Sequence, residues 1–146
     1  FLGNKAGEAE AFRDVERGNV TFGGYQDDIP SLLSGCYVGC IPSTGWDSYP
    51  MSSLEMQACA LPVIVSDLQG CPETIGADTG IVVPAGNVTA LWDAIVGIVN
   101  DPARRDRMSA AARARIERSL TTEHQVQNLV LAVSDPLAAA SRLIAG

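Results

Sequence analysis

Two short apolar runs with a helix-length segment between them constrain the fold of this chain most strongly. The first run is Tyr37–Pro42, and the second, Pro62–Ser66, directly follows a segment that we expect to be helical up to about Leu61. Short, continuous apolar runs are typical of buried strands. Adjacent parallel strands are joined by a crossover that is usually a helix. The pattern therefore predicts a strand–loop–helix–strand unit of a parallel sheet.

The remaining signals extend this unit into one α/β domain. With 146 residues and 47% hydrophobic side chains, the chain suffices for one domain with a core. Alternating strands and amphipathic helices predict a Rossmann-like three-layer sandwich with a mainly parallel sheet of about four or five strands. We expect strands at 20–23, 36–41, 62–66 and 79–84. Helices are expected at 5–17, after Asp28, after Asn87, at 103–118 with Met108, Ala112 and Ile116 inward, and from Thr121 with Val126, Leu129, Val130 and Val133.

The charge distribution restricts the class of partner. A formal charge of −7 argues against nucleic acid or an anionic membrane surface as the main partner. No Lys or Arg occurs between Asn19 and Ala103. If the central stretch binds a diphosphate, its neutralisation must come from helix N–H groups together with Lys5, an upstream segment or a metal. The arginines at 104–118 are interpreted as a solvated face, and a loose membrane contact stays open as the alternative.

The cysteines favour a reducing environment over a metal site. Cys36, Cys40, Cys59 and Cys71 form no paired C-x-x-C pattern, and His124 is the sole histidine. Zinc binding is therefore not expected. Cys36 and Cys40 lie four residues apart on an expected strand, so both should face one side as small apolar residues. No signal peptide or membrane span is recognised, which predicts a cytoplasmic protein.

Two carboxylates, Asp47 and Glu55, bracket the segment where the loop after the first apolar run becomes a helix. In open parallel sheets ligands bind beyond the carboxyl ends of strands, where helix N–H groups can meet phosphate. Both acids have simpler interpretations. Ser52–Glu55 has the pattern of a capping box, in which Glu55 only bonds back to its own helix. Asp47 could cap a turn before Pro50.

Five segments in order resemble one known family. They read NVTFGGY, DIPSLLSGCYVGCIPS, WDSYPMSSLEMQACALPVIVSDLQGCPETI, TGIVVPAGN and DPARRDRMSAAARARI. In this order and spacing they resemble the C-terminal, donor-binding half of the group 1 glycosyltransferases, retaining enzymes of GT-B architecture that use sugar nucleotides. The resemblance implies that residues 1–146 are one nucleotide-sugar-binding domain, truncated at its N-terminus, and that the acceptor domain is missing from this chain.

The resemblance also implies roles for individual residues. Asp47 would be the catalytic residue and would lie beside the sugar and the reacting carbon, and Glu55 would accept hydrogen bonds from the ribose hydroxyls. Charged acceptors suit such hydroxyls because these bonds are stronger than neutral ones. The donor-binding set implied by the family is Gly24, Tyr25, Tyr49, Met51, Ser52, Glu55, Gly70 and Glu73. No metal and no cofactor are expected. Glu73 could instead only satisfy a helix dipole.

Three positions depart from the family pattern. Asp47 replaces the usual Glu and is one methylene shorter, which puts its catalytic geometry in question. Leu61 stands where the family usually has Gly, so the turn between helix and strand must close in another way. Gln69 replaces the first of two usual glycines and would narrow the loop beside the donor.

The sequence therefore predicts a glycosyltransferase domain that binds a nucleotide-diphosphate sugar for transfer with retention. The chain alone is expected to bind the donor weakly and to transfer nothing. One alternative is a degenerate, non-catalytic domain of the same fold with an assembly or ligand-sensing role. Another, a sugar-nucleotide epimerase, is less favoured because the matching region holds no His to act as acid or base. A place at the inner membrane face stays open.

Overall fold

The computed structural model describes residues 19–21 and 23–136, in two units, Phe1–Gly35 and Cys36–Gly146. The helix predicted over 5–17 lies outside the described residues. In the first unit, α1 (Ile29–Ser34) begins as predicted, with Asp28 Oδ1 accepting the Ser31 N–H at 3.1 Å. The described residues of the predicted strand 20–23 form no strand, and Gly24 makes only an isolated bridge. Gly24 has a φ of 63°, a left-handed conformation that does not continue a strand.

The second unit contains a parallel sheet. Its strands are β1 (Gly39–Ile41), β2 (Val63–Ser66) and β3 (Gly80–Val83), in the order β1-β2-β3, and both neighbouring pairs are parallel. The predicted parallel sheet is confirmed, but within the described residues it has three strands and not four or five. The first strand also begins later than predicted. Cys36 is exposed and precedes β1, so the prediction that Cys36 and Cys40 share a strand face is wrong. Helix α1 has its C-cap at Gly35, and a bend at Tyr37 precedes β1.

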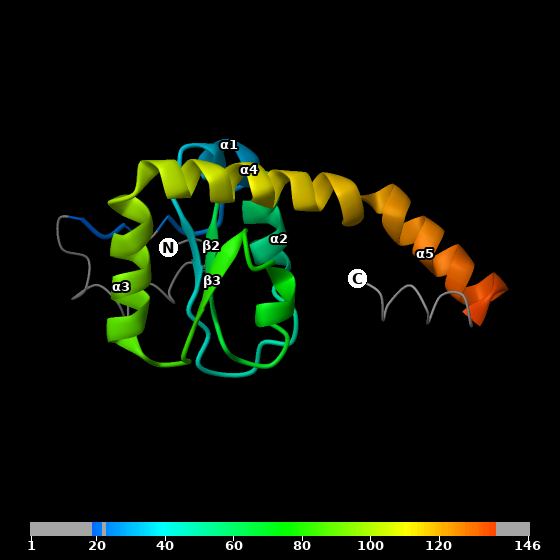
Figure 1. The fold of residues 1–146 in the computed structure, drawn as a ribbon, viewed down its shortest axis with the longest axis horizontal. Coiled ribbons are helices and arrows are strands. Elements are labelled where there is room, and N and C mark those ends of the chain that lie inside the picture. Colours follow the sequence, from blue (N-terminus) through cyan, green and yellow to red (C-terminus); the bar gives the residue numbers. More distant parts are fainter. Residues whose placement is uncertain (1–18, 22, 137–146) are drawn as a thin grey trace. The chain divides into compact units, whose positions relative to one another are not determined.

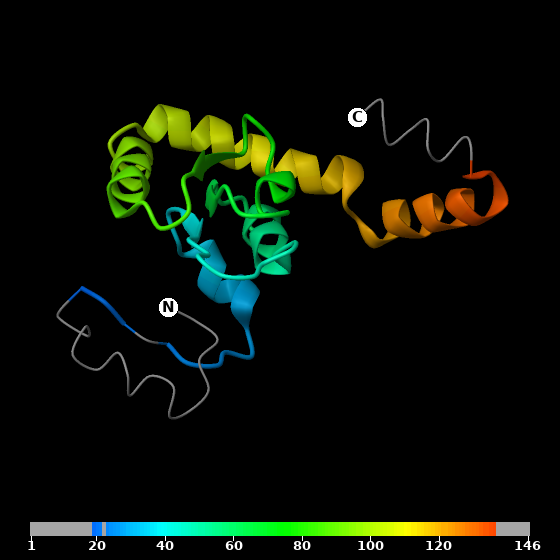
Figure 2. The ribbon, with the colours of Figure 1, turned by 90° about the horizontal axis from the view of Figure 1, so that it is seen from below.

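Helices cover both faces of this sheet, as the three-layer prediction requires. Helix α2 (Met51–Ala58) lies on one side and α3 (Val88–Val99) on the other, while α4 (Pro102–Ser119) runs from α3 to α2 (Figures 1 and 2). Successive residues of β2 point to opposite faces. Val63 and Val65 pack with Met56 of α2, whereas Ile64 packs with Ile98 of α3.

Helices α3 and α5 (Thr122–Ser134) begin as predicted, with Asn87 and Thr121 accepting backbone N–H groups. Helix α4 begins one residue earlier than predicted, at Pro102, and Asp101 accepts the Arg104 N–H. Met108 and Ala112 point inward from α4, as predicted. No residue of α5 is buried, and Val126, Leu129, Val130 and Val133 are exposed. None of the described helices has the length and apolar character needed to cross a membrane.

The turn between α2 and β2 closes without glycine. Ala60 adopts a φ of 58°, the left-handed conformation typical of a helix C-terminus. The Leu61 N–H donates to Met56 O at 3.0 Å, and the Ala60 N–H donates to Gln57 O at 2.9 Å. These two bonds form a Schellman motif. The left-handed residue is thus Ala60, one position before Leu61.

Candidate functional site

Asp47 lies in the loop between β1 and α2, beyond the carboxyl end of β1. Its side chain is half-buried, and Oδ2 accepts the Ser43 hydroxyl at 2.7 Å. That bond spans four residues within the same loop. The turn-capping alternative for Asp47 is therefore not found in its predicted form, since the carboxylate's partner is upstream Ser43 and not a backbone group before Pro50.

The loop that follows β2 holds the Asp47 backbone from both sides. Gln69 Oε1 accepts the Asp47 N–H at 2.9 Å, and Cys71 Sγ donates to Asp47 O at 3.6 Å. Burial raises the pKa of the Cys71 thiol, and the Asp47 charge raises it further, so the thiol keeps its proton. Between them, Gly70 lies against Ser48 O, which would be only 1.7 Å from a Cβ at that position. Only glycine fits this approach.

Helix α2 presents an N-terminus with no side-chain cap. Its N-cap position is Pro50, which makes no capping hydrogen bond, and Met51 and Ser52 are the first two helical residues. The first N–H groups of a helix have no partner within the helix. Tyr49, Met51 and Ser52 are all exposed here. The structure therefore leaves donors available where the diphosphate was predicted to bind.

Glu55 is not part of a capping box. The box needs Ser52 at the N-cap and Glu55 three residues later, but α2 begins at Met51, so Glu55 lies in its second turn. Its carboxylate is exposed and makes no hydrogen bond or ion pair with another described residue. The capping alternative is therefore wrong, and this acid is available to a ligand.

Glu73 lies on the 3-10 helix η2 (Pro72–Thr74), next to the α2 N-terminus. The Thr74 hydroxyl donates to Ser53 Oγ at 2.8 Å, and Gln57 Nε2 donates to Thr74 O at 2.7 Å. Ser53, Gln57 and Thr74 are fully buried. This buried network fixes η2 against α2, and so fixes the position of Glu73 relative to Ser52 and Glu55.

Arg115 of α4 completes the network. Its Nη1 donates to Thr74 O at 2.9 Å and Gln57 Oε1 at 3.3 Å, and its Nη2 donates to Glu73 O at 3.2 Å. Arg105 lies over the Tyr37 ring, 3.9 Å from its centroid. The arginines of α4 were predicted to form a solvated face, but Arg105 and Arg115 make these specific contacts. Arg115 brings a positive charge to the acidic central stretch, a contact that sequence reasoning missed because the partners are 41 to 58 residues apart.

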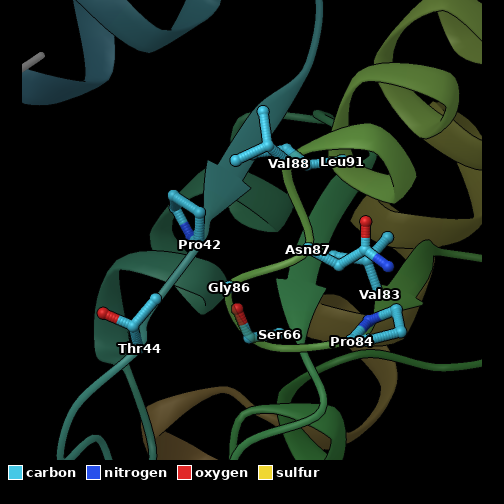
Figure 3. Close-up of a pocket in the computed structure, with 9 residues that line it drawn as sticks. All are labelled: Pro42, Thr44, Ser66, Val83, Pro84, Gly86, Asn87, Val88 and Leu91. Atoms are coloured by element: carbon cyan, nitrogen blue, oxygen red, sulfur yellow. The ribbon is translucent and has the colours of Figure 1, made fainter.

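A separate pocket lies on the α3 side of the sheet, at the carboxyl ends of the strands (Figure 3). Its volume is about 110 Å³. Small-molecule sites usually occupy about 300 to 1,000 Å³, so this pocket is too small for a nucleotide sugar. It includes none of the predicted donor-binding residues. Its lining residues are Pro42, Thr44, Ser66, Val83, Pro84, Gly86, Asn87, Val88 and Leu91.

The structure thus brings together the predicted residues of the second unit around two loops. Asp47 and Tyr49 belong to the loop after β1, and Gly70 to the loop after β2, and these loops are in contact. Gly24 and Tyr25 belong to the first unit, where Gly24 has a positive φ and Tyr25 is 77% exposed. Across the described residues, no three His, Cys, Asp or Glu side chains gather as metal ligands.

The parallel sheet with helices on both faces and paired loops at its carboxyl edge define a Rossmann-like α/β class of domain, in which ligands usually bind at that edge. Residues 2–101 match the sequence profile of the family described as Glycosyl transferases group 1. The chain belongs to this family of glycosyltransferases.

Relatives and solved structures agree with this assignment. The chain is 30% identical over 118 residues to a phosphatidyl-myo-inositol mannosyltransferase of Mycobacterium leprae, covering 77% of this chain and 32% of the relative. It is 44% identical over 64 residues to a GDP-mannose-dependent mannosyltransferase of Corynebacterium glutamicum that acts on a monoacylated phosphatidylinositol monomannoside. This match covers 44% of this chain and 17% of the relative. The Anabaena HepE structure with UDP and glucose shares the fold, with a TM-score of 0.80 at 19% identity. This match covers 92% of this chain and 39% of the HepE chain. The chain therefore spans about a third or less of these two relatives.

Proposed function

We propose that this domain binds a nucleotide-diphosphate sugar and presents its anomeric carbon for transfer with retention. The observation that carries the proposal is the Glu55 carboxylate, which is exposed and unpaired among the described residues beside the uncapped start of α2. In this proposal Glu55 accepts the ribose hydroxyls. The N–H groups of Tyr49, Met51 and Ser52 meet the diphosphate, aided by the positive end of the helix dipole.

Asp47 lies beside the sugar and Glu73 lies near the phosphates in this proposal. Catalysis rests on positioning and on stabilising the departing diphosphate, to which helix N–H groups contribute. Gly24 and Tyr25 meet the base, and Gly70 lets the loop after β2 approach the donor. No metal or cofactor is required.

The substrates of two relatives contain membrane lipids, which supports a location of this protein near the membrane. One acts on a monoacylated phosphatidylinositol monomannoside, and another, from Campylobacter jejuni, on N,N'-diacetylbacillosaminyl-diphospho-undecaprenol. We propose a cytoplasmic protein working at the inner membrane face, with the acceptor bound by a domain missing from this chain. Both relatives are transferases, so the alternative of a non-catalytic domain gains no support from them. We expect this chain alone to bind donor without transferring it.

Calorimetric titration of the 146-residue chain with UDP, GDP and ADP tests the proposal. One nucleotide should bind saturably, and Glu55→Ala should weaken its binding about tenfold or more, because hydrogen bonds to charged groups contribute about 1.5 to 3 kcal/mol. Glu123→Ala is the matched control, since it removes an exposed helix glutamate far along the chain on α5. Absence of binding to all three nucleotides, or binding unaffected by Glu55→Ala, would overturn the proposal.

A further inference from the structure

Gln69 has a backbone conformation that side chains rarely adopt. Its φ is 46°, and among the described residues the only other non-glycine residue with positive φ is Ala60. A Cβ atom in this left-handed region crowds the following carbonyl, so the conformation is unfavourable for any residue except glycine. Unlike Ala60, Gln69 is not at the end of a helix. It lies in the turn that the Cys71 N–H closes on Leu68 O at 3.0 Å, a turn position where a positive φ is found and glycine is preferred.

That conformation places the Gln69 amide on the Asp47 backbone. The Oε1 atom accepts the Asp47 N–H at 2.9 Å, across 22 residues of sequence. The next two residues hold the same segment, because Gly70 packs on Ser48 O and Cys71 donates to Asp47 O. Three consecutive residues therefore fix the backbone on both sides of the Asp47 Cα. Glycine at position 69 could adopt the same φ but would have no group to accept the N–H.

The position of this backbone matters because the Asp47 side chain is short. An Asp carboxylate is separated from its backbone by a single methylene, so any backbone movement is passed on almost unchanged to its oxygens. Its Oδ2 accepts the Ser43 hydroxyl, in the same loop. The hydrogen bonds from Gln69 and Cys71 hold the Asp47 backbone, Gly70 packs on Ser48 O, and the carboxylate itself interacts with the Cys71 thiol.

We propose that Gln69 is a positioning residue, which holds the Asp47 carboxylate against the sugar of the donor. This inference rests on the proposed function, in which Asp47 meets the sugar and Glu55 meets the ribose. Losing the Gln69 amide should therefore weaken recognition of the sugar and leave recognition of the nucleotide intact. A residue that only stabilised the loop would affect both ligands alike.

Gln69→Gly separates these two roles. Glycine relieves the left-handed strain, so the thermal midpoint of the 146-residue chain should stay the same or rise. The affinity for UDP-glucose or GDP-mannose should nevertheless fall about three- to tenfold, the contribution of one hydrogen bond, while that for UDP or GDP is unchanged. Gln69→Met, which keeps the length but has no amide, should show the same loss of affinity. Gln125→Gly in the exposed helix α5 is the control, and it should change neither affinity.

A double-mutant cycle with Asp47→Ala completes the test. If Gln69 acts through Asp47, Gln69→Gly should cause no further loss of sugar-nucleotide affinity once the carboxylate is gone. Additive losses, or equal losses for nucleotide and nucleotide sugar, would overturn this inference and leave the proposed function standing. Failure of the unmodified chain to bind any of the four ligands would overturn both.

Discussion

The two faces of the sheet are held to their helices by different interactions. On the α3 side, Ile64, Val83, Ile98 and Met108 form an apolar cluster, and buried Ser66 lies at the end of β2 on this side. On the α2 side, the valines of β2 also pack against apolar residues, but fully buried Ser53, Gln57 and Thr74 lie in the same layer and bond to one another and to Arg115. The proposed donor-binding residues of α2 and η2 all belong to this second face.

The difference suggests a division of tasks. Apolar contacts are non-directional, so they stabilise a fold without fixing one exact spacing of its elements. Hydrogen bonds between buried groups are satisfied only over a narrow range of distance and angle. The α3 side should therefore provide stability, and the α2 side should set the spacing of Ser52, Glu55 and Glu73. The following variants test this division.

The largest effect is expected on the apolar face. Ile98→Ala removes a fully buried side chain and should lower the free energy of unfolding by about 2 to 5 kcal/mol. Urea denaturation followed by far-UV circular dichroism measures the change. The neighbouring Val99→Ala, at a position 45% exposed, should change it by about 0.5 kcal/mol or less. Nucleotide affinity of the folded Ile98→Ala protein should be unchanged, and a large loss would break the proposed division.

A smaller loss of stability, with a loss of binding, is expected on the polar face. Gln57→Leu removes the donor to Thr74 O and the acceptor for Arg115, and should cost about 1 to 3 kcal/mol. Because η2 is then free to shift from α2, nucleotide affinity should also fall. Gln125→Leu on exposed α5 is the control. A Gln57→Leu protein that is more stable and binds equally well would show that packing alone holds this face.

The contrast between the faces also explains what could be predicted from the sequence. The parallel sheet, the caps at Asp28 and Asn87 and the inward face of α4 followed from periodicity and local signals, which depend on neighbouring residues. Among the residues that the structure describes, the sheet has three strands and not four or five, and β1 begins later than predicted, because short strands near glycines have weak local signals. At the site, the motif spacing predicted Asp47 and Glu55. The capping box could be excluded only once the structure showed that α2 begins at Met51.

The polar network could not be predicted in the same way. Gln57, Thr74 and Arg115 come from three elements, and nothing in the local pattern of any of them marks a buried hydrogen-bonding residue. A buried Gln contradicts the usual preference of this residue for the surface. Gln69 did stand out as a departure from the family pattern, but its bond to the Asp47 N–H depends on a contact 22 residues away.

A pH-dependent effect is expected within the apolar face. Burial raises the pKa of Cys40, which packs on the α3-side cluster, from 9.0 to about 11. Between these values the unfolded chain releases a proton that the folded chain keeps, so the free energy of unfolding should fall as pH rises from 9 to 11. Relative to Cys40→Ala, the fall should reach about 1 to 2 kcal/mol. Parallel pH profiles for the two proteins in urea denaturation would contradict this expectation.

The smallest effect is a gain in stability, on the polar face. Ala60 occupies the left-handed position after α2, where glycine has no Cβ penalty, so Ala60→Gly should raise the free energy of unfolding by about 0.5 to 1 kcal/mol. Ala58→Gly, two residues earlier and still helical, should lower it by a similar amount. Thermal unfolding of both variants gives the two signs. A loss for both would mean that the Ala60 methyl group packs favourably enough to outweigh the strain of its conformation. A gain at Ala60 with unchanged nucleotide affinity would show that the position of the α2 N-terminus is set by the buried hydrogen bonds and not by the turn at its other end.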